Sequence, residues 1–175
     1  MPKLIPELRS MILQAARRHL LEDENHDITM RQLALDCGTA VGTVYNYFPS
    51  KEVLISEAMM SDWTACISRM QAGAENAMQP LEGMQAIVDA LHSFDGRYQP
   101  IWKNYAGTSS SVESLWTRHE ALIRAIAEPV KTVLVRFGCL FDPNLPEVLS
   151  ELVLMAARTE DGFARIAPVL ERILR

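Results

Sequence analysis

Residues 29–51, TMRQLALDCGTAVGTVYNYFPSK, decide the fold. Apolar residues recur there every three or four positions in two successive pieces, which is the pattern of one face of an α-helix. The first piece has Met30, Leu33, Ala34 and Cys37, and the second has Val41, Val44, Tyr45 and Phe48. Gly38 lies between the pieces and can adopt the left-handed conformation that ends a helix. The stretch therefore predicts two short amphipathic helices joined by a tight turn, a helix-turn-helix.

The ends of these two helices carry boundary signals. Thr29 precedes the first helix and Gln32 follows three positions later, which is the spacing of a capping box. Pro49 ends the second helix, because its ring disfavours helical geometry in the residue before it. Ser50 is placed to cap a further helix.

The second helix has one side that its apolar face leaves open. If its apolar face packs inward, the side left open carries Gly42, Thr43, Asn46 and Tyr47. An amide can pair with adenine edges, whereas a hydroxyl or phenol can bind phosphate. Gly42 removes a side chain, so that the backbone can approach DNA closely. The periodicity alone would favour an ordinary helical hairpin.

The segment CGTAVGTVYNYFPSK, residues 37–51, resembles the signature of the tetracycline-repressor (TetR) family of bacterial transcription regulators. The matching positions are Gly38, Gly42, Thr43, Tyr45, Tyr47, Phe48 and Lys51. Two positions depart from the family pattern, since Thr39 stands where valine is usual and Ala40 where serine is frequent. Ala40 has no side-chain oxygen and cannot cap the recognition helix. The start of that helix is therefore less well fixed unless Thr39 supplies the cap.

The resemblance implies an all-α protein of about nine helices. Residues 1–49 would form a three-helix DNA-binding domain, and residues 50–175 a helical domain for ligand sensing and dimerisation. On this basis we predict DNA contacts from Thr29, Arg31, Gly42, Thr43, Tyr45, Asn46, Tyr47 and Lys51.

Composition and charge limit the classes of function. The chain has 175 residues, of which 49% are hydrophobic, and a formal net charge of −5. The first fifty residues are not basic either, so we expect few phosphate contacts. The logarithm of DNA affinity should then fall with the logarithm of salt concentration by a slope no steeper than about −8 per dimer.

Other functional classes lack their signatures. Cys37, Cys66 and Cys139 are far apart and have no metal-ligand or disulfide spacing. No nucleophile–base pair, phosphate loop or metalloprotease motif occurs, so we expect neither an enzyme nor a bound metal or cofactor. Without a leader or a long apolar run, we expect a cytoplasmic protein with no membrane partner. A redox-sensing thiol at Cys37 remains an alternative to a buried, inert one.

The rest of the chain predicts a series of helices. Residues 50–72 form a long helix that, by the resemblance, joins the DNA-binding part to the sensor part. Helical patterns follow at 81–96, 97–106 and 112–137, with Gly96 and Pro100 bracketing a break. A tilt of the 50–72 helix could couple the two sites.

The last two helices, at about 145–158 and 161–174, form the dimer interface that the resemblance implies. The first of them is apolar nearly all round, which indicates burial on several sides. Packing against the 112–137 helix alone is the alternative. The predicted interface residues are Val148, Leu152, Met155, Phe163, Ile166 and Leu170.

Aromatic and methionine side chains are concentrated in the middle third of the chain. We predict a ligand pocket among Met59, Trp63, Phe94, Tyr98, Trp102, Tyr105, Trp116 and His119. The same pattern is also typical of plain core, and the pocket rests on the family resemblance. The ligand would be a small apolar or aromatic effector.

Together these features predict a homodimeric regulator that binds a palindromic operator in double-stranded DNA. A repressor released by its effector is the leading hypothesis. The alternative is a helical partner-binding or redox-responsive regulator with weak or lost DNA binding.

Overall fold

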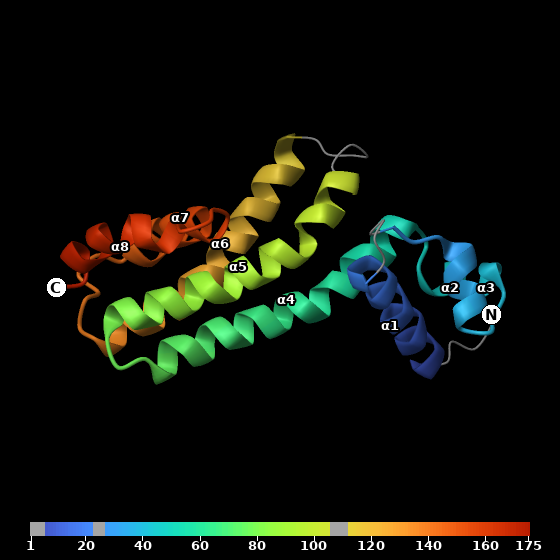
Figure 1. Ribbon diagram of the computed structural model, residues 1–175, viewed down its shortest axis with the longest axis horizontal. Helices are drawn as coiled ribbons and strands as arrows, with labels where there is room; N and C mark the ends of the chain where they lie inside the picture. The colour runs from blue at the N-terminus through green and yellow to red at the C-terminus, as the bar shows by residue number, and fades with distance from the viewer. Residues whose placement is uncertain (1–5, 23–26, 106–111) are drawn as a thin grey trace. The chain divides into compact units, whose positions relative to one another are not determined.

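The computed structural model describes the backbone of residues 6–22, 27–105 and 112–175, and the side chains of these ranges except 102–118. The described residues form helices and connections without any strand, as the all-α prediction requires. Eight helices follow one another (Figure 1): α1 (Pro6–Glu22), α2 (Met30–Asp36), α3 (Val41–Tyr47), α4 (Lys51–Asn76), α5 (Pro80–Tyr105), α6 (Val112–Arg136), α7 (Leu145–Ala157) and α8 (Gly162–Ile173).

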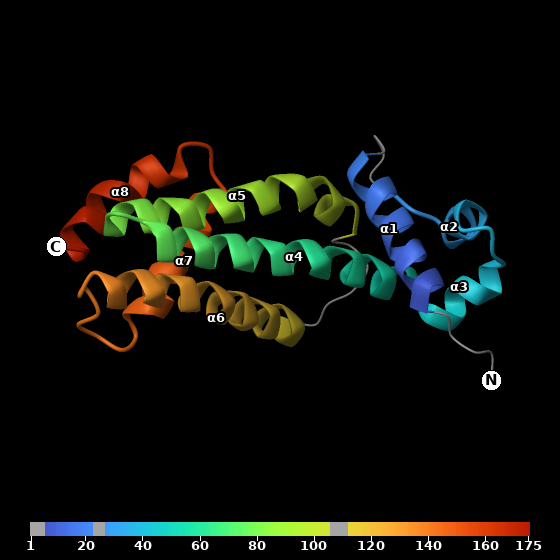
Figure 2. The same ribbon diagram turned by 90° about the horizontal axis from the view of Figure 1, so that it is seen from below.

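The chain divides into two compact units. The first holds residues 1–63 and 97–107, and the second holds residues 64–96 and 108–175. The helices α4 and α5 therefore contribute residues to both units. In the second unit α4, α5 and α6 run alongside one another, as Figure 2 shows.

The first unit is built on the side chains that α1 and the helix-turn-helix bury together. Its apolar side chains include Ile12, Ala16, Leu20, Leu33, Val44, Phe48 and Leu54, each at most 1% exposed, and α2 adds Ala34 at 2%. Figure 1 shows α2 and α3 side by side, next to α1. Burial of a large aliphatic or aromatic side chain contributes about 1.5–3 kcal/mol, so this core fixes the position of α3.

The second unit packs α6 against α7 and α7 against α8. Its buried apolar side chains include Met70, Met84, Ile87, Ile126, Val130, Leu134, Leu149, Val153 and Leu170. Gly138 ends α6 with a positive φ of 70°, and the next residue's amide, that of Cys139, bonds back to the Leu134 carbonyl at 2.8 Å. This closure of the helix end is the reason that glycine suits the position.

The break expected between Gly96 and Pro100 is absent. One helix, α5, runs through both Gly96 and Pro100 to Tyr105, which accounts for eight described helices rather than nine. Inside a helix a proline removes one amide donor and strains one turn, and a long helix that is packed over the rest of its length can tolerate this. Gly96 and Pro100, four residues apart, therefore do not interrupt α5.

The long helix α4 also extends past its predicted end at residue 72, to Asn76. Gly73 lies inside it, where a Cβ would stand 2.5 Å from the Cβ of Ala86 on α5. This glycine therefore serves close packing between two helices rather than a turn. None of the described helices is long and apolar enough to cross a membrane.

Candidate nucleic-acid interface

The turn between α2 and α3 is closed by backbone hydrogen bonds. Gly38 has a φ of 61°, and beside it the Thr39 amide donates to the Ala34 carbonyl at 2.8 Å. The Cys37 amide donates to the Leu33 carbonyl at 3.0 Å. These bonds satisfy carbonyls that would otherwise be left unpaired at the end of α2. The predicted left-handed turn at Gly38 is confirmed.

The start of α2 is capped as predicted on one side only. The Thr29 hydroxyl accepts a hydrogen bond from the Gln32 amide at 3.1 Å. The Gln32 side chain does not turn back to Thr29, because its Nε2 donates to Asp36 at 2.9 Å, one turn further along α2. Half of the expected capping box is therefore replaced by a bond along the helix. At α3 the N-cap Ala40 makes no side-chain cap, as expected.

The inward face of α3 is narrower than the sequence predicted. Val44 and Phe48 are 0% exposed, whereas Val41 is 37% and Tyr45 49% exposed. The prediction that Val41 and Tyr45 are buried is wrong. A seven-residue helix makes about two turns, and its contact with the core is confined here to a stripe at Val44 and Phe48. Adjacent residues lie about 100° apart around a helix, so Tyr45 is turned away from that stripe.

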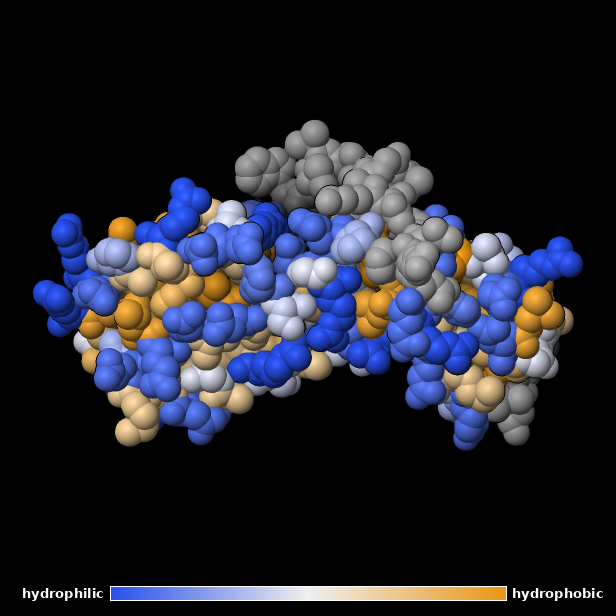
Figure 3. Space-filling model, in the orientation of Figure 1, coloured by the Kyte–Doolittle hydropathy of each residue, from blue (hydrophilic) through white to orange (hydrophobic). Residues whose placement is uncertain are grey.

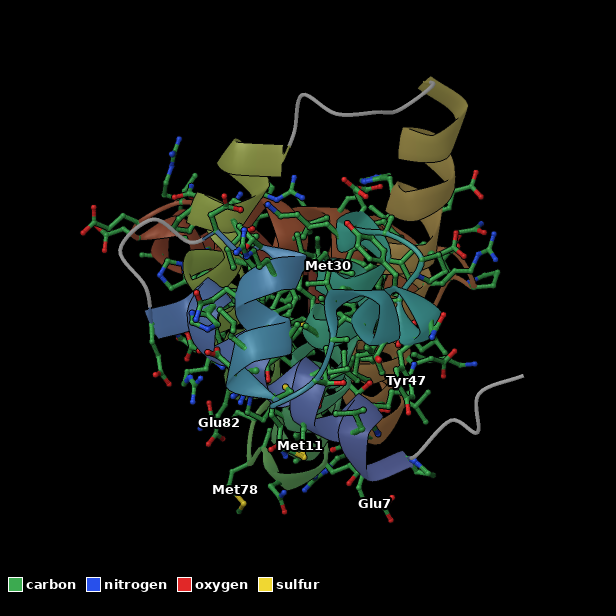
Figure 4. The ribbon with its side chains drawn as sticks, turned by 90° about the vertical axis from the view of Figure 1, so that its right-hand side faces the viewer. Glu7, Met11, Met30, Tyr47, Met78 and Glu82 are labelled. Carbon is green, nitrogen blue, oxygen red and sulfur yellow. The ribbon has the colours of Figure 1, made fainter. Side chains whose placement is uncertain are left out.

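The open side predicted for α3 is solvent-accessible in this chain. Gly42 and Asn46 are exposed, and Thr43 and Tyr47 are half-buried at the margin. A Cβ placed on Gly42 would meet nothing within 4 Å. Figure 4 views this end of the molecule, with Met30 at the start of α2 and Tyr47 at the end of α3. The other six predicted DNA contacts are mostly exposed as well. Thr29, Arg31, Gly42, Tyr45 and Asn46 are exposed, and Lys51 is half-buried.

Positive charge beside this face is sparse and partly compensated. Arg31 is exposed and makes no ion pair with any residue that the structure describes. Lys51 lies at the start of α4, where its ammonium group stands 2.5 Å from the Asp27 carboxylate. No local sequence signal indicates the Lys51–Asp27 pair, because the two residues are 24 positions apart.

The position of α2 on α1 is reinforced by ionic contacts at Asp36. Its carboxylate lies 2.5 Å from His19 Nε2 and 3.2 Å from Arg18 Nη2. The hydrogen bond from His19, followed by that from Gln32, lowers the pKa of Asp36. On the opposite end of α1, Arg9 pairs with Glu57 of α4 and lies over the Phe48 ring, 5.2 Å from its centroid.

A buried carboxylate joins α1, α4 and α5 within the first unit. Asp62 is 8% exposed, and its Oδ2 accepts a hydrogen bond from the Tyr98 hydroxyl at 2.6 Å. Arg17 Nε stands 3.1 Å from both carboxylate oxygens, and Arg97 Nη1 lies 3.5 Å away. Burial alone would raise the pKa of Asp62, but the hydrogen bonds from Tyr98 and Arg17 bring it below its ordinary value.

The same cluster changes the interpretation of Tyr98. We predicted it as a ligand contact, yet its side chain is 1% exposed and its hydroxyl is bound to Asp62. Burial and then the hydrogen bond to Asp62 raise the pKa of Tyr98, so it is the donor in this pair. Sequence reasoning missed Asp62 and Arg17, because they are 45 residues apart and neither belongs to a motif.

Comparison with known proteins agrees with this geometry. The profile of the family described as "Bacterial regulatory proteins, tetR family" matches residues 12–58, which contain most of α1 and all of α2 and α3. The HTH-type transcriptional regulator UidR of Escherichia coli K12 is 30% identical over 96 residues. The helix-turn-helix part of the chain is therefore similar to that of TetR-family regulators.

The matched stretch covers 51% of this chain and 45% of UidR, so the chain spans about half the length of that relative. Solved structures share the fold at lower identity. A transcriptional regulator from Cytophaga hutchinsonii has a TM-score of 0.65 and 14% identity, covering 94% of this chain and 93% of its own. A TetR regulator from Legionella pneumophila has a TM-score of 0.55 and 17% identity, covering 99% and 96%. These proteins are named as regulators, not enzymes.

The residues that we predicted for an effector site have different environments. Met59 is buried, and Trp63 and Phe94 are half-buried. The side chains of Trp102, Tyr105 and Trp116 lie outside the described residues. His119 Nε2 stands 2.8 Å from Glu151 and lines a groove of about 470 Å³ between α6 and α7. Most of the side chains lining that groove are charged, so it does not have the apolar character that we predicted.

The predicted dimer residues of α7 and α8 also divide into two groups. Val148 is 56% and Met155 55% exposed, and Leu152 between them is half-buried. Phe163 is half-buried as well. Ile166 and Leu170 are buried by the chain's own residues, so in this chain they hold α8 in place and offer no open surface. Figure 3 shows hydrophobic residues at the surface over the α7 and α8 end of the second unit.

Proposed function

We propose that this chain is a dimeric, sequence-specific DNA-binding regulator of transcription, and that α3 is its recognition helix. The observation that carries the proposal is the open face of α3, where Val41, Gly42, Tyr45 and Asn46 are all exposed. A buried core at Val44 and Phe48 holds this helix from behind. In a helix-turn-helix the second helix enters the major groove, and the first crosses the backbone.

Groups suited to phosphate surround this face. The hydroxyls of Thr29, Thr43 and Tyr47 and the charge of Arg31 can contact the DNA backbone on either side of the groove. Lys51 can do so as well if phosphate displaces Asp27 from its ammonium group. An exchange of one anion for another contributes little net affinity, which fits the shallow salt dependence expected for this chain.

The second copy would dock on α7. Val148, Leu152 and Met155 are spaced four and three residues apart and form one incompletely covered stripe. A large apolar patch on a folded surface indicates a protein contact. A twofold dimer would place two α3 helices about 34–36 Å apart, one turn of DNA, and so favour a palindromic operator. Acting on DNA, such a dimer would work in the cytoplasm.

The effector would act through α4 and α5, because these helices contribute to both units. We propose a small apolar or aromatic ligand that contacts residues of the sensor part, from Met59 onward, and releases the protein from its operator. The ligand would favour one position of α4 and DNA the other, which is the two-state coupling that allostery requires.

The test is a footprint of the purified protein on DNA selected from a random pool, and on the region upstream of its own gene. A variant with Tyr47→Phe and Lys51→Ala removes two phosphate-binding groups and keeps the buried packing. It should bind DNA more weakly, mainly through loss of the Tyr47 hydroxyl, while remaining a dimer in sedimentation. Lys131→Ala, an exposed change on α6, is the matched control and should keep full affinity. If the parent protein protects no palindromic site in the footprint, the hypothesis that it is a repressor is refuted.

A helical partner-binding regulator with weak or lost DNA binding is the second candidate. The pairing of Lys51 with Asp27 and the acidic net charge favour it. A redox-responsive version is disfavoured, because burial and the neighbouring Asp36 raise the pKa of Cys37, and the thiolate is the reactive form. Dimers that bind no DNA in the footprint experiment would support the partner-binding function.

A further inference from the structure

The exposed face of α3 has an unusual composition for a surface that meets an anionic duplex. At about 100° per residue, Val41, Tyr45, Gly42 and Asn46 follow one another around about 140° of the helix. Val41 and Tyr45, four residues apart, form an apolar stripe. Both are large side chains, yet Val41 is 37% and Tyr45 49% exposed to solvent. Gly42 and Asn46 form the neighbouring stripe. Half of the face is therefore apolar, and the other half offers one amide.

The helix contains no cation. Its sequence is VGTVYNY, so it cannot offer the bidentate contact from arginine or lysine that most often specifies guanine. The amide of Asn46 matches the N6 donor and N7 acceptor of adenine instead. Apolar side chains such as Val41 match the C5-methyl group of thymine. The chemistry of this face therefore favours A·T over G·C base pairs.

Gly42 adds an independent indication that this face closely approaches another surface. Glycine in a helix costs stability relative to alanine, so a glycine there usually has a structural reason. Neither strain nor packing supplies one here, because its φ is not in the left-handed region and a Cβ would meet nothing within 4 Å. The space above Gly42 would instead admit the edge of a base between the side chains of Val41 and Asn46.

We propose that α3 recognises A·T base pairs in the major groove. Val41, backed by the Tyr45 ring, contacts thymine methyl groups, and Asn46 pairs with the N6 and N7 atoms of an adenine. The operator half-site then has A·T pairs where α3 lies. The inference rests on the proposed function, since α3 must first enter a major groove.

The first experiment compares modified bases in a half-site obtained by selection from a random pool. Replacing a contacted thymine by deoxyuridine removes only its C5-methyl group, and affinity measured by fluorescence anisotropy should fall about fourfold for each methyl. Replacing the contacted adenine by 7-deazaadenine removes the N7 acceptor and should lower affinity about tenfold. The same changes outside the half-sites serve as controls and should have no effect.

The second experiment assigns each base contact to a side chain. Val41→Ala should bind the unmodified site more weakly and should no longer respond to the loss of the thymine methyl. Asn46→Ala should become insensitive to 7-deazaadenine and keep its response to deoxyuridine. Val135→Ala, an exposed valine on α6, is the matched control and should respond to both modifications as the parent does. Both substituted positions are exposed, so the variants should fold.

The outcomes separate this inference from the proposed function. Selected half-sites with G·C pairs at the α3 positions, or full insensitivity to deoxyuridine, would overturn A·T recognition while the protein remains a DNA-binding regulator. Failure to select any DNA would overturn the proposed function, and A·T recognition with it. Sensitivity that disappears in Val41→Ala and Asn46→Ala, each for its own base, is the result that we expect.

Discussion

Replacing Gly42 by alanine should raise stability and lower DNA affinity at the same time. The added methyl group meets nothing within 4 Å in the folded chain, and the backbone does not need the left-handed conformation. A glycine-to-alanine change inside a helix stabilises by about 0.5–1 kcal/mol, and near the start of α3 we expect the lower end of that range. Stability is measured by denaturant unfolding.

The loss of affinity in Gly42→Ala arises in the complex with DNA. In the complex the methyl group would occupy the space that a base edge needs, and overpacking of a close contact costs about 1–3 kcal/mol. Each half-site should therefore lose about tenfold in affinity, and a dimer on its palindrome about a hundredfold, if 1.4 kcal/mol is lost at each. Fluorescence anisotropy on the same protein preparation measures this loss.

The matched control is Gly96→Ala. Gly96 lies inside α5, and a Cβ there also meets nothing within 4 Å. This variant should gain similar stability and keep its DNA affinity. A Gly42→Ala protein that binds DNA as tightly as the parent would refute the reasoning, because α3 would then not approach the groove at Gly42. A loss of stability in Gly42→Ala would show that its environment is not open.

Three further predictions concern other parts of the chain. Tyr98→Phe should lower the free energy of unfolding by about 1.5–3 kcal/mol, the range for a hydrogen bond to a charged group. Because the pKa of Asp62 is lowered by folding, its stabilisation is present above the unfolded pKa of about 3.9 and is lost as pH falls through the folded pKa. Tyr98→Phe should make unfolding less dependent on pH in that range, and a titrated series of urea unfolding curves checks both statements. Gly73→Ala should destabilise by about 1–3 kcal/mol, in contrast to Gly96→Ala, since its methyl meets Ala86 at 2.5 Å; equal melting temperatures for the two variants would contradict this. Met155→Glu should leave helix content unchanged and weaken the dimer at least tenfold in sedimentation, because a charge would be buried at the interface; an unaltered dimer would remove α7 from it.

The helix-turn-helix could be predicted because its signals are local. The cap at Thr29, the left-handed Gly38 and the spacing of Leu33 and Ala34 act within a few residues, and the structure has each of them. The burial of Val41 was predicted wrongly. Apolar spacing shows which residues share a face, but not how much of that face a seven-residue helix covers.

Features that depend on distant residues were not predicted. The Asp62 cluster joins side chains 45 and 36 positions apart, and no spacing rule brings them together. The continuation of α5 through Gly96 and Pro100 has the same origin, because packing along a long helix outweighs a local preference for a break. Candidate effector residues such as Tyr98 were assigned by their apolar character, and only its contacts show that this one serves the framework.

The most direct test of the central claim is hydroxyl-radical footprinting of the protein with and without its selected DNA. The account predicts that Tyr45, which is 49% exposed, loses most of its reactivity when DNA binds. Met78 and Phe141, exposed by 79% and 73% and remote from the helix-turn-helix in sequence, should react as before. Undiminished oxidation of Tyr45 in a complex shown to be saturated with DNA would contradict the assignment of α3 as the recognition helix.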